Sequence, residues 1–282
     1  ATLNDRRLSI KATLEHELDY NEFNSLVRMN LNTYLLAYRG TSSYGYLSTF
    51  TIDADGDPIT EVASLQFTTS TMNYPSVIQM TEDTYIVAYY GYDTGTDHNG
   101  TAITNGGWGH WISTFRVKPD GSVITKLGTL RHDYHNNSDP YNSLVKVDDD
   151  TYALAYKTRN QGTPYYYQNG GWIKTFTVNG ATITQTAELR HFTSWSYMHS
   201  WAQASANTFV MSWNDNSSDG RITTFTIPAD GSSITEVAEL EYDTDQATHP
   251  ELAKLDADTY VVAFQGTGNV GEIATFTIPT DG

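Results

Sequence analysis

The stretch that decides the fold is EDTYIVAY at residues 82–89. Its pattern is a polar turn, an aromatic residue and an apolar run. Four other stretches repeat this pattern: LNTYLLAY at 31–38, DDTYALAY at 149–156, ANTFVMSW at 206–213 and ADTYVVAF at 257–264. The aromatic anchors Tyr34, Tyr85, Tyr152, Phe209 and Tyr260 are spaced by 51, 67, 57 and 51 residues. A repeat of this length predicts tandem copies of one supersecondary unit.

A second run follows each anchor and ends in an Asp-Gly or Asn-Gly turn. The five runs are YLSTFTI, WISTFRV, WIKTFTV, RITTFTI and EIATFTI, and the turn glycines are Gly56, Gly121, Gly180, Gly231 and Gly282. Such pairs favour two-residue hairpins because the turn needs positive φ. A third run follows the turn, and a fourth precedes the next anchor. All are rich in Thr, Tyr, Val and Ile, so each repeat predicts four short antiparallel strands.

Tandem four-stranded units of this kind resemble the blades of the β-propeller superfamily over essentially the whole chain. The resemblance implies an all-β, five-bladed β-propeller in a single domain over residues 1–282. The blade cores are expected at 24–67, 75–132, 142–191, 199–242 and 250–282 plus 6–18. No signature of a specific family of known activity is present.

The two ends of the chain predict how the ring closes. The last repeat stops at Gly282 after its third strand and turn, and RLSIKATLEHELD at 7–19 matches GSSITEVAELEYD at 231–243. The N-terminal strand is therefore expected to complete the last blade and leave no long edge exposed. A closed ring of this kind predicts a monomer.

Composition narrows the classes of function. The 282 residues include 33 Asp and Glu against 16 Lys and Arg, for a formal charge of −17, and no Cys. Nucleic acid is disfavoured as a partner because phosphate binding needs clustered cations. Thiolate zinc sites, disulfides and cysteine catalysis are excluded. No apolar stretch is long enough to insert in a membrane. We expect a mature chain without signal peptide, secreted or at the cell surface, with no cofactor.

Insertions single out one face of the predicted ring. The anchor-to-Phe distance is 16 residues in three repeats, 30 in the second and 24 in the third. The extra residues fall at 92–110 and 158–171, and the connection at 131–143 is expected on the same face. All six Trp lie between 108 and 213. Loops on a rigid scaffold usually carry function, so the site is expected over the second to fourth repeats. The alternative is that these aromatics pack the loops against one another.

The aromatic residues in this sector suit a carbohydrate ligand. Flat apolar faces pack on sugar rings, and nearby polar groups pair with hydroxyls. The candidate ligand-binding residues are Trp108, Trp111, Trp172, Trp195, Trp201, Tyr165, Tyr166, Asn142 and Arg159. They predict lectin-like glycan recognition, although Trp111 and Trp172 also suit a structural role at the start of a strand. A protein-interaction or adhesion platform would use the same aromatic surface.

An enzyme is the alternative that the same sector leaves open. A His or Tyr can abstract a proton beside a carboxylate that an Arg neutralises, which is the chemistry of uronate elimination. The candidate catalytic residues are His135, His199, Tyr134, Tyr197, Arg131 and Arg190. Some polysaccharide lyases are propellers with such residues, so the resemblance allows a lyase. A glycoside hydrolase is less favoured because it needs paired carboxylates. A weak metal alternative is His132 and His135 with Asp133.

A ring of small hydroxyl residues is expected near the axis. Ser25, Ser76, Ser143, Ser200 and Glu251 each lie nine residues before an anchor. They should begin the innermost strands, where crowding favours small side chains; a water or ion site is the alternative. Asn24, Asn142 and His199, just before three of these serines, are further ligand-contact candidates.

Overall fold

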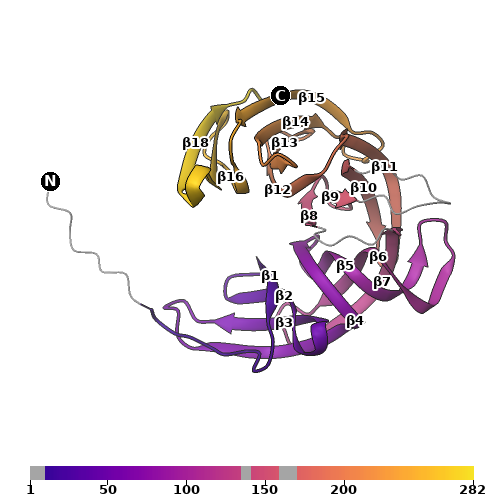
Figure 1. Cartoon of the computed structure of the whole chain (residues 1–282). Helices are drawn as coiled ribbons and strands as arrows, with labels where there is room; N and C mark the ends of the chain where they lie inside the picture. The colour runs from indigo at the N-terminus through magenta and orange to yellow at the C-terminus, as the bar shows by residue number, and fades with distance from the viewer. Residues whose placement is uncertain (1–9, 135–140, 159–169) are drawn as a thin grey trace, which may run out of the picture.

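The computed structural model describes residues 10–134, 141–158 and 170–282. In this part of the chain the structure is all-β, as predicted, with eighteen strands, two short 3-10 turns (η1, Thr41–Ser43; η2, Thr267–Asn269) and no α-helix. No helix there could span a membrane. The strands form antiparallel groups that follow the chain around a common centre (Figure 1).

The groups follow the order of the five sequence repeats, each running from an innermost strand to an outer one. Group 1 contains β1 (Glu22–Arg28), β2 (Thr33–Arg39), β3 (Tyr44–Ile52) and the first part of β4 (Ile59–Gln79). Group 2 contains the rest of β4, β5 (Thr84–Asp97), β6 (Ala102–Val117) and β7 (Ile124–Asp133). The long strand β4 therefore leaves one group and enters the next.

The remaining strands form three separate sheets. Group 3 contains β8 (Ser143–Lys146), β9 (Thr151–Thr158), β10 (Gly170–Asn179) and β11 (Thr182–Phe192). Group 4 contains β12 (Ser196–Gln203), β13 (Thr208–Asp215), β14 (Gly220–Thr226) and β15 (Thr235–Asp243). Group 5 contains β16 (Thr248–Lys254), β17 (Thr259–Gln265) and β18 (Gly271–Thr277).

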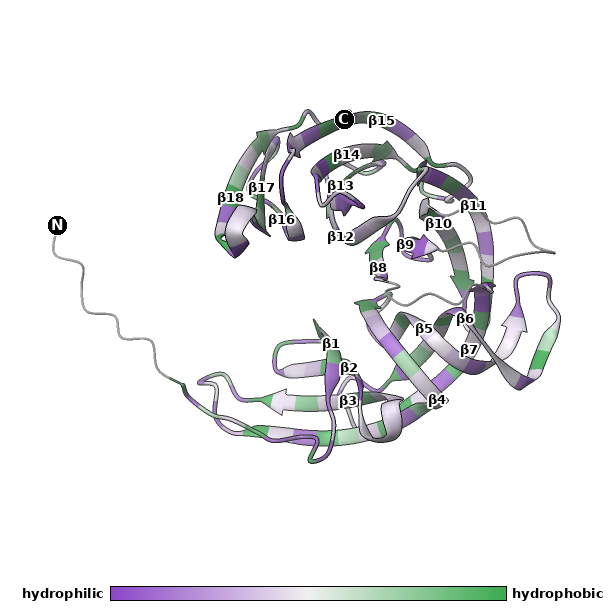
Figure 2. Ribbon diagram, in the orientation of Figure 1, coloured by the Kyte–Doolittle hydropathy of each residue, from purple (hydrophilic) through white to green (hydrophobic). Residues whose placement is uncertain are grey.

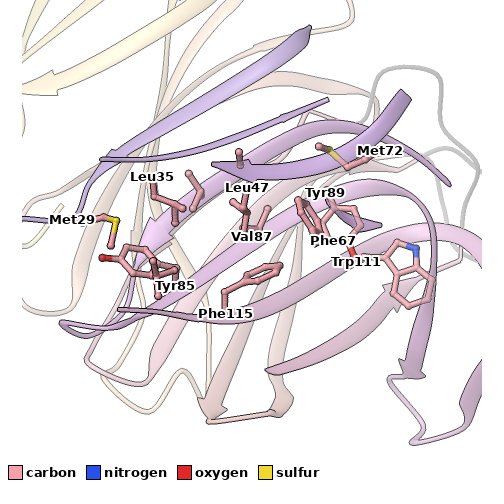
Figure 3. Packing of buried hydrophobic residues seen from close by; sticks show 13 residues of the cluster. Met29, Leu35, Leu47, Phe67, Met72, Tyr85, Val87, Tyr89, Trp111 and Phe115 are labelled. Atoms are coloured by element: carbon pink, nitrogen blue, oxygen red, sulfur yellow. The ribbon is translucent and has the colours of Figure 1, made fainter. Parts of the chain in front are cut away.

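The hydrophobic core lies between successive groups. Apolar and polar residues alternate along many strands, so each sheet presents apolar side chains to its neighbours (Figure 2). Figure 3 shows the first of these layers, where Leu35 and Leu47 of group 1 meet Val87 and Phe115 of group 2. Such interdigitated layers exclude water and provide most of the stabilisation.

The outer strand of each of groups 1 to 4 places one ring against two aromatic residues of the next group. Phe67 lies 5.4 Å from Tyr89 and 5.2 Å from Phe115, measured between ring centroids. The same arrangement recurs for His132 on Tyr156 and Phe176, for His191 on Trp213 and Phe225, and for Tyr242 on Phe264 and Phe276. His132 and His191 are therefore packing residues in this structure.

The serine ring joins neighbouring groups. Ser25 Oγ accepts the N–H of Val77 (3.0 Å), Ser76 Oγ that of Leu144 (3.2 Å), and Ser200 Oγ that of Leu252 (3.0 Å). Each hydroxyl thus satisfies a backbone donor of the following innermost strand. These serines therefore act as hydrogen-bond acceptors between groups. This role is neither of the two that the sequence suggested, a small residue in a crowded position or a water or ion site.

The predicted closure of the ring is not present in the described structure. Group 5 has three strands, and the arc is open between β18 and group 1 (Figure 1). Residues 10–19 run along group 1 instead, where His16 lies 4.9 Å from Tyr38 and 5.5 Å from Phe50. His16 therefore packs against group 1 in the same way as Phe67, on the outer strand of group 1, packs against group 2.

The insertion at 92–110 forms a strand hairpin, not the loop that the sequence predicted. It extends β5 and β6 into a long hairpin that turns onto the outer strand of its own group. There Thr96 pairs with Leu130 and Asp97 with Arg131 in a parallel arrangement. The hairpin projects from the outer side of the arc in Figure 1. Its own strand pairing explains this course, because unpaired backbone groups would otherwise remain.

Candidate functional site

The starts of the innermost strands of groups 1, 2, 4 and 5 carry the same backbone irregularity. Phe23, Tyr74, Met198 and His249 have φ of 55°, 49°, 52° and 56°, and the strand register shifts at each of them. A non-glycine residue in this left-handed region is uncommon, and such bulges re-aim side chains. Tyr141 has the equivalent position in group 3. We call Phe23, Tyr74, Tyr141, Met198 and His249 the axial residues.

The axial residues surround a cavity of about 310 Å³ at the centre of the groups. Phe23 and Tyr74 lie 4.1 Å apart, and Tyr74 and Tyr141 lie 4.7 Å apart, between ring centroids. The residue after each axial residue also lines the cavity, together with Glu251: Asn24, Pro75, Asn142, His199 and Pro250. All five groups thus contribute to one hollow with aromatic walls.

Polar groups lie among these rings. Asn142 Nδ2 donates to the carbonyl of Tyr74 (3.1 Å), while its Oδ1 has no donor within the described residues. Glu251 Oε2 accepts a hydrogen bond from Ser200 Oγ (3.2 Å). Among the described lining residues, Glu251 is the one carboxylate, and none is Lys or Arg. A hollow that combines apolar faces with polar groups is typical of small-ligand sites.

His199 connects the cavity to a buried polar cluster. Its Nε2 lies 2.7 Å from Ser196 Oγ, which is itself 3.4 Å from His191 Nε2. Burial, with a smaller effect from the Lys157 charge, lowers the pKa of His199 to about 3. Burial also lowers the pKa of His191 and of His132 well below the ordinary value. All three imidazoles are therefore neutral at pH 7.

Acidification is expected to destabilise the fold through these histidines. Their pKa is depressed by folding, so between about pH 6.5 and 4 the unfolded chain binds protons that the folded chain excludes. The free energy of unfolding should fall with pH by up to about 1.4 kcal/mol per pH unit for each histidine. Urea unfolding at several pH values measures the slope. His199→Gln should reduce this slope, and a slope equal to that of the unsubstituted protein would contradict the assignment.

The structure places the predicted ligand-binding residues and the catalytic candidate Tyr197 in several different environments. Asn142 lines the cavity. The rings of Tyr197 and Tyr141 lie 6.5 Å apart between centroids. Lys157 Nζ lies above the Tyr197 ring and 5.5 Å from the centroid of the Trp195 ring. Trp201 is half-buried, and its Nε1 donates to the carbonyl of Ser143. Asn142 therefore lines the cavity and Tyr197 lies beside its lining residue Tyr141, whereas Trp201 packs against the core between groups 3 and 4.

Two of the predicted tryptophans are packing residues in this structure. Trp111 is fully buried and donates to the carbonyl of Gly91 (3.1 Å), which leaves no ring face for a ligand. Trp172 packs against the core between groups 2 and 3. Trp108 is 41% exposed but stacks on Tyr90 on the extended hairpin, away from the cavity residues.

The arginines of the proposed lyase do not line the cavity. The Arg131 guanidinium lies over Trp111 and Tyr134, and Arg190 donates to the carbonyl of Thr193. Tyr134 donates to Asp97 (2.5 Å), and burial followed by this bond raises its pKa to about 12. A tyrosine with such a pKa is a poor base at neutral pH.

The metal alternative gains no support. Asp133 accepts a hydrogen bond from Tyr156, and His132 is enclosed by aromatic rings. No group of three or more His, Asp or Glu in residues 10–134, 141–158 and 170–282 is arranged to hold a metal ion. His135, Arg159, Tyr165 and Tyr166 lie outside the described residues.

Sequence reasoning missed the axial residues as a set. A signal was present: the triplets FNS, YPS, YNS, MHS and HPE stand at equivalent places, at 23–25, 74–76, 141–143, 198–200 and 249–251. The second and third positions of these triplets hold the predicted ligand contacts and the serine ring. The first position carries the re-aimed side chain, because strand alternation fails at the bulge.

Comparisons with known proteins identify the fold. NanB sialidase from Streptococcus pneumoniae matches with a TM-score of 0.55 at 11% identity, over 83% of this chain and 36% of that chain. An AofleA mutant from Arthrobotrys oligospora matches with a TM-score of 0.55 at 11% identity, over 93% and 71%. Saccharomyces cerevisiae Sqt1 matches with a TM-score of 0.54 at 9% identity, over 90% and 58%.

The chain has a β-propeller-like fold. It spans little more than half of Sqt1 and about a third of the sialidase chain. No family model and no curated protein matches it. At such low identity the likeness shows the fold alone, so function has to be argued from the cavity.

Proposed function

We propose that this propeller-like protein binds a glycan in its axial cavity. The observation that carries the proposal is the repeated left-handed bulge, which turns the axial side chains of groups 1, 2, 4 and 5 toward one hollow that Tyr141 of group 3 also lines. Backbone strain of this kind persists where the surroundings enforce it and is concentrated at functional sites. Three adjacent aromatic rings offer apolar faces, while Asn24, Asn142 and Glu251 offer partners for hydroxyls.

A neutral sugar is the favoured ligand. The described lining has no Lys or Arg to neutralise a uronate or sialate carboxylate, and Glu251 would repel one. Hydrolysis requires two carboxyl groups across the scissile bond, whereas the described lining supplies one. Binding is therefore preferred to lyase or hydrolase chemistry. One protein of similar fold is a sialidase, but the proposal for this chain depends on its own cavity.

The proposal includes the finer architecture. The five groups act as blades of one ring in a single domain, so that all five axial residues face the same ligand. The acidic composition and the absence of Cys favour an extracellular protein that works as a monomer. A glycan that reaches the cavity end-on would contact all five blades at once.

Alanine substitution of an axial tyrosine tests the proposal. Tyr74→Ala and Tyr141→Ala each remove an aromatic wall of the cavity. Loss of that contact is expected to cost about 1.5–3 kcal/mol, or about a 10- to 150-fold rise in Kd. The measurement is calorimetry against a panel of neutral and acidic oligosaccharides that first identifies the ligand. Trp108→Ala is the matched control, since it removes a larger exposed aromatic residue outside the cavity.

Two results would count against the proposal. One is a loss of affinity in Trp108→Ala that equals the loss in Tyr74→Ala, which would move the site to the hairpin. The other is the appearance of new reducing ends during incubation with a polysaccharide, because binding alone cleaves nothing. In that case Glu251→Gln identifies whether the carboxylate in the cavity is the catalytic group.

A further inference from the structure

A serine hydroxyl of group 4 lies between two imidazoles. Ser196 Oγ is 2.7 Å from His199 Nε2 and 3.4 Å from His191 Nε2. Ser196, His199 and His191 are 0%, 7% and 8% exposed, so bulk water takes little part in these contacts. His199 lines the axial cavity, whereas His191 packs on Trp213 in the core. The serine therefore joins a residue of the cavity wall to the core.

The backbone beside this serine provides the room that the arrangement needs. A Cβ at Gly171 of β10 would collide with both Ser196 Oγ and His191 Nε2. Only a glycine therefore lets β10 run so close to the hydroxyl and the ring. The contact between Ser196 and the two imidazoles is thus supported by a second strand.

The residue at the place of Ser196 matches the ring that packs onto the same group. A polar residue accompanies histidine, and an apolar residue accompanies phenylalanine or tyrosine. The pairs in groups 1, 2, 4 and 5 are His16 with Asn21, Phe67 with Met72, His191 with Ser196 and Tyr242 with Ala247. A hydroxyl at this place is therefore explained by its imidazole neighbours and not by a need for a small side chain.

The number of protons fixes the tautomers of the two histidines. Burial lowers the pKa of both, so each neutral ring carries one N–H at pH 7. The Ser196 hydroxyl has one proton, so it donates to one Nε2 and accepts from the other, which places the two rings in opposite tautomers. The 2.7 Å contact has the length of a bond from a hydroxyl donor, whereas 3.4 Å is long. Ser196 therefore donates to His199 and accepts weakly from His191.

His199 consequently carries its own proton on Nδ1. The hydrogen bond at one ring nitrogen decides which nitrogen is protonated, and here it reverses the preference of free histidine for Nε2. His199 Nδ1 has no hydrogen-bond partner among the described residues, and a buried donor without a partner is costly. On the neighbouring group, Asn142 Nδ2 donates to the carbonyl of Tyr74, which leaves Oδ1 as an acceptor without a donor there.

We propose that Ser196 is a positioning residue that holds His199 in the Nδ1–H tautomer and thereby selects a ligand hydroxyl on this side of the cavity. The hydroxyl accepts from His199 Nδ1 and donates to Asn142 Oδ1, because a hydroxyl can do both. A ligand without a hydroxyl at this point leaves both groups unpaired and is disfavoured. The selection rests on the proposed function, whereas the tautomer is a property of the protein alone.

Two substitutions with precedents in the same chain test the proposal. Ser196→Ala removes the hydroxyl, and alanine fills the same place in group 5 as Ala247. His191→Phe removes the second imidazole but keeps an aromatic ring, as at Phe67. In the full chain with 15N-labelled histidines, long-range proton–nitrogen NMR spectra show which ring nitrogen carries the proton, and His199→Gln identifies the His199 signals. Calorimetry on the same proteins gives Kd for the glycan.

We expect His199 to be protonated at Nδ1 in the unsubstituted protein and in His191→Phe, and to lose this preference in Ser196→Ala. The Kd should rise about 5-fold in Ser196→Ala, as for one neutral hydrogen bond, and stay within about twofold in His191→Phe. A role in packing alone would leave the tautomer unchanged in both variants.

Protonation of His199 at Nε2 in the unsubstituted protein would overturn the inference, and so would an unchanged tautomer in Ser196→Ala. The expected tautomers with an unchanged Kd would overturn the selection of a hydroxyl. If no glycan binds at all, the proposed function fails together with that selection, while the spectra still decide whether Ser196 sets the tautomer. The two failures are therefore distinguishable.

Discussion

Replacing Asp93 by alanine is expected to lower the free energy of unfolding by about 3 kcal/mol. Asp93 is 1% exposed and accepts hydrogen bonds from Tyr89 Oη at 2.5 Å and from Lys126 Nζ at 2.8 Å. Its removal leaves the Lys126 ammonium without its counter-ion in a largely enclosed site. Because Lys126 keeps a bond to the carbonyl of Phe67 and some contact with solvent, the loss should lie at the lower end of the range for broken buried pairs.

Asp149→Ala supplies the control for this prediction. Asp149 accepts from Lys146 Nζ at 2.9 Å but is almost fully exposed, and such pairs contribute about 0–1 kcal/mol. Urea unfolding midpoints measure both changes under the same conditions. Equal effects of the two substitutions would show that burial of the Asp93 pair does not decide its contribution.

Trp213→Ala is expected to cost about 3–5 kcal/mol. The indole is fully buried, lies 4.9 Å from His191 and 4.8 Å from Phe192 between ring centroids, and donates to Thr223 Oγ1 at 2.9 Å. Its loss leaves a cavity between groups 3 and 4 and removes the hydrogen bond to Thr223. Thermal or denaturant unfolding measures the change.

Trp108→Ala is the comparison for Trp213. Its ring is partly exposed on the hairpin, so the expected cost is below about 1.5 kcal/mol. If both substitutions destabilised equally, the hairpin would be as much a part of the core as the interface between groups. A small effect for Trp213 would instead mean that the interface repacks around the lost indole.

The strands could be predicted from the sequence because each repeat contains its own local signals for them. The anchor aromatics, the Phe of the following run and the Asp-Gly turns each specify one strand or hairpin without reference to distant residues. The hairpin at 92–110 could not be placed in the same way. Its course depends on Thr96 meeting Leu130 of the outer strand, a pairing that local sequence does not encode.

The candidate site was predictable only in part for a related reason. The tryptophans were predicted as ligand residues because they cluster along the chain. However, Trp111 and Arg131 lie opposite each other on paired strands and pack against each other within one group. Trp172 and Arg190 repeat that cross-strand pairing. Asn142 and His199 were recognised because they precede the serine ring. The axial residues beside them were not, because a bulge reverses the side on which a residue lies.

The direction of the serine hydrogen bonds bears on the order in which the groups assemble. Each hydroxyl belongs to an earlier group and accepts an N–H from the group that follows it in the chain. During synthesis a new repeat of 51 residues emerges in roughly 3–10 seconds, so it meets a neighbour whose acceptor is already in place. Assembly can therefore proceed vectorially from the ribosome, one repeat at a time, each templated by its predecessor.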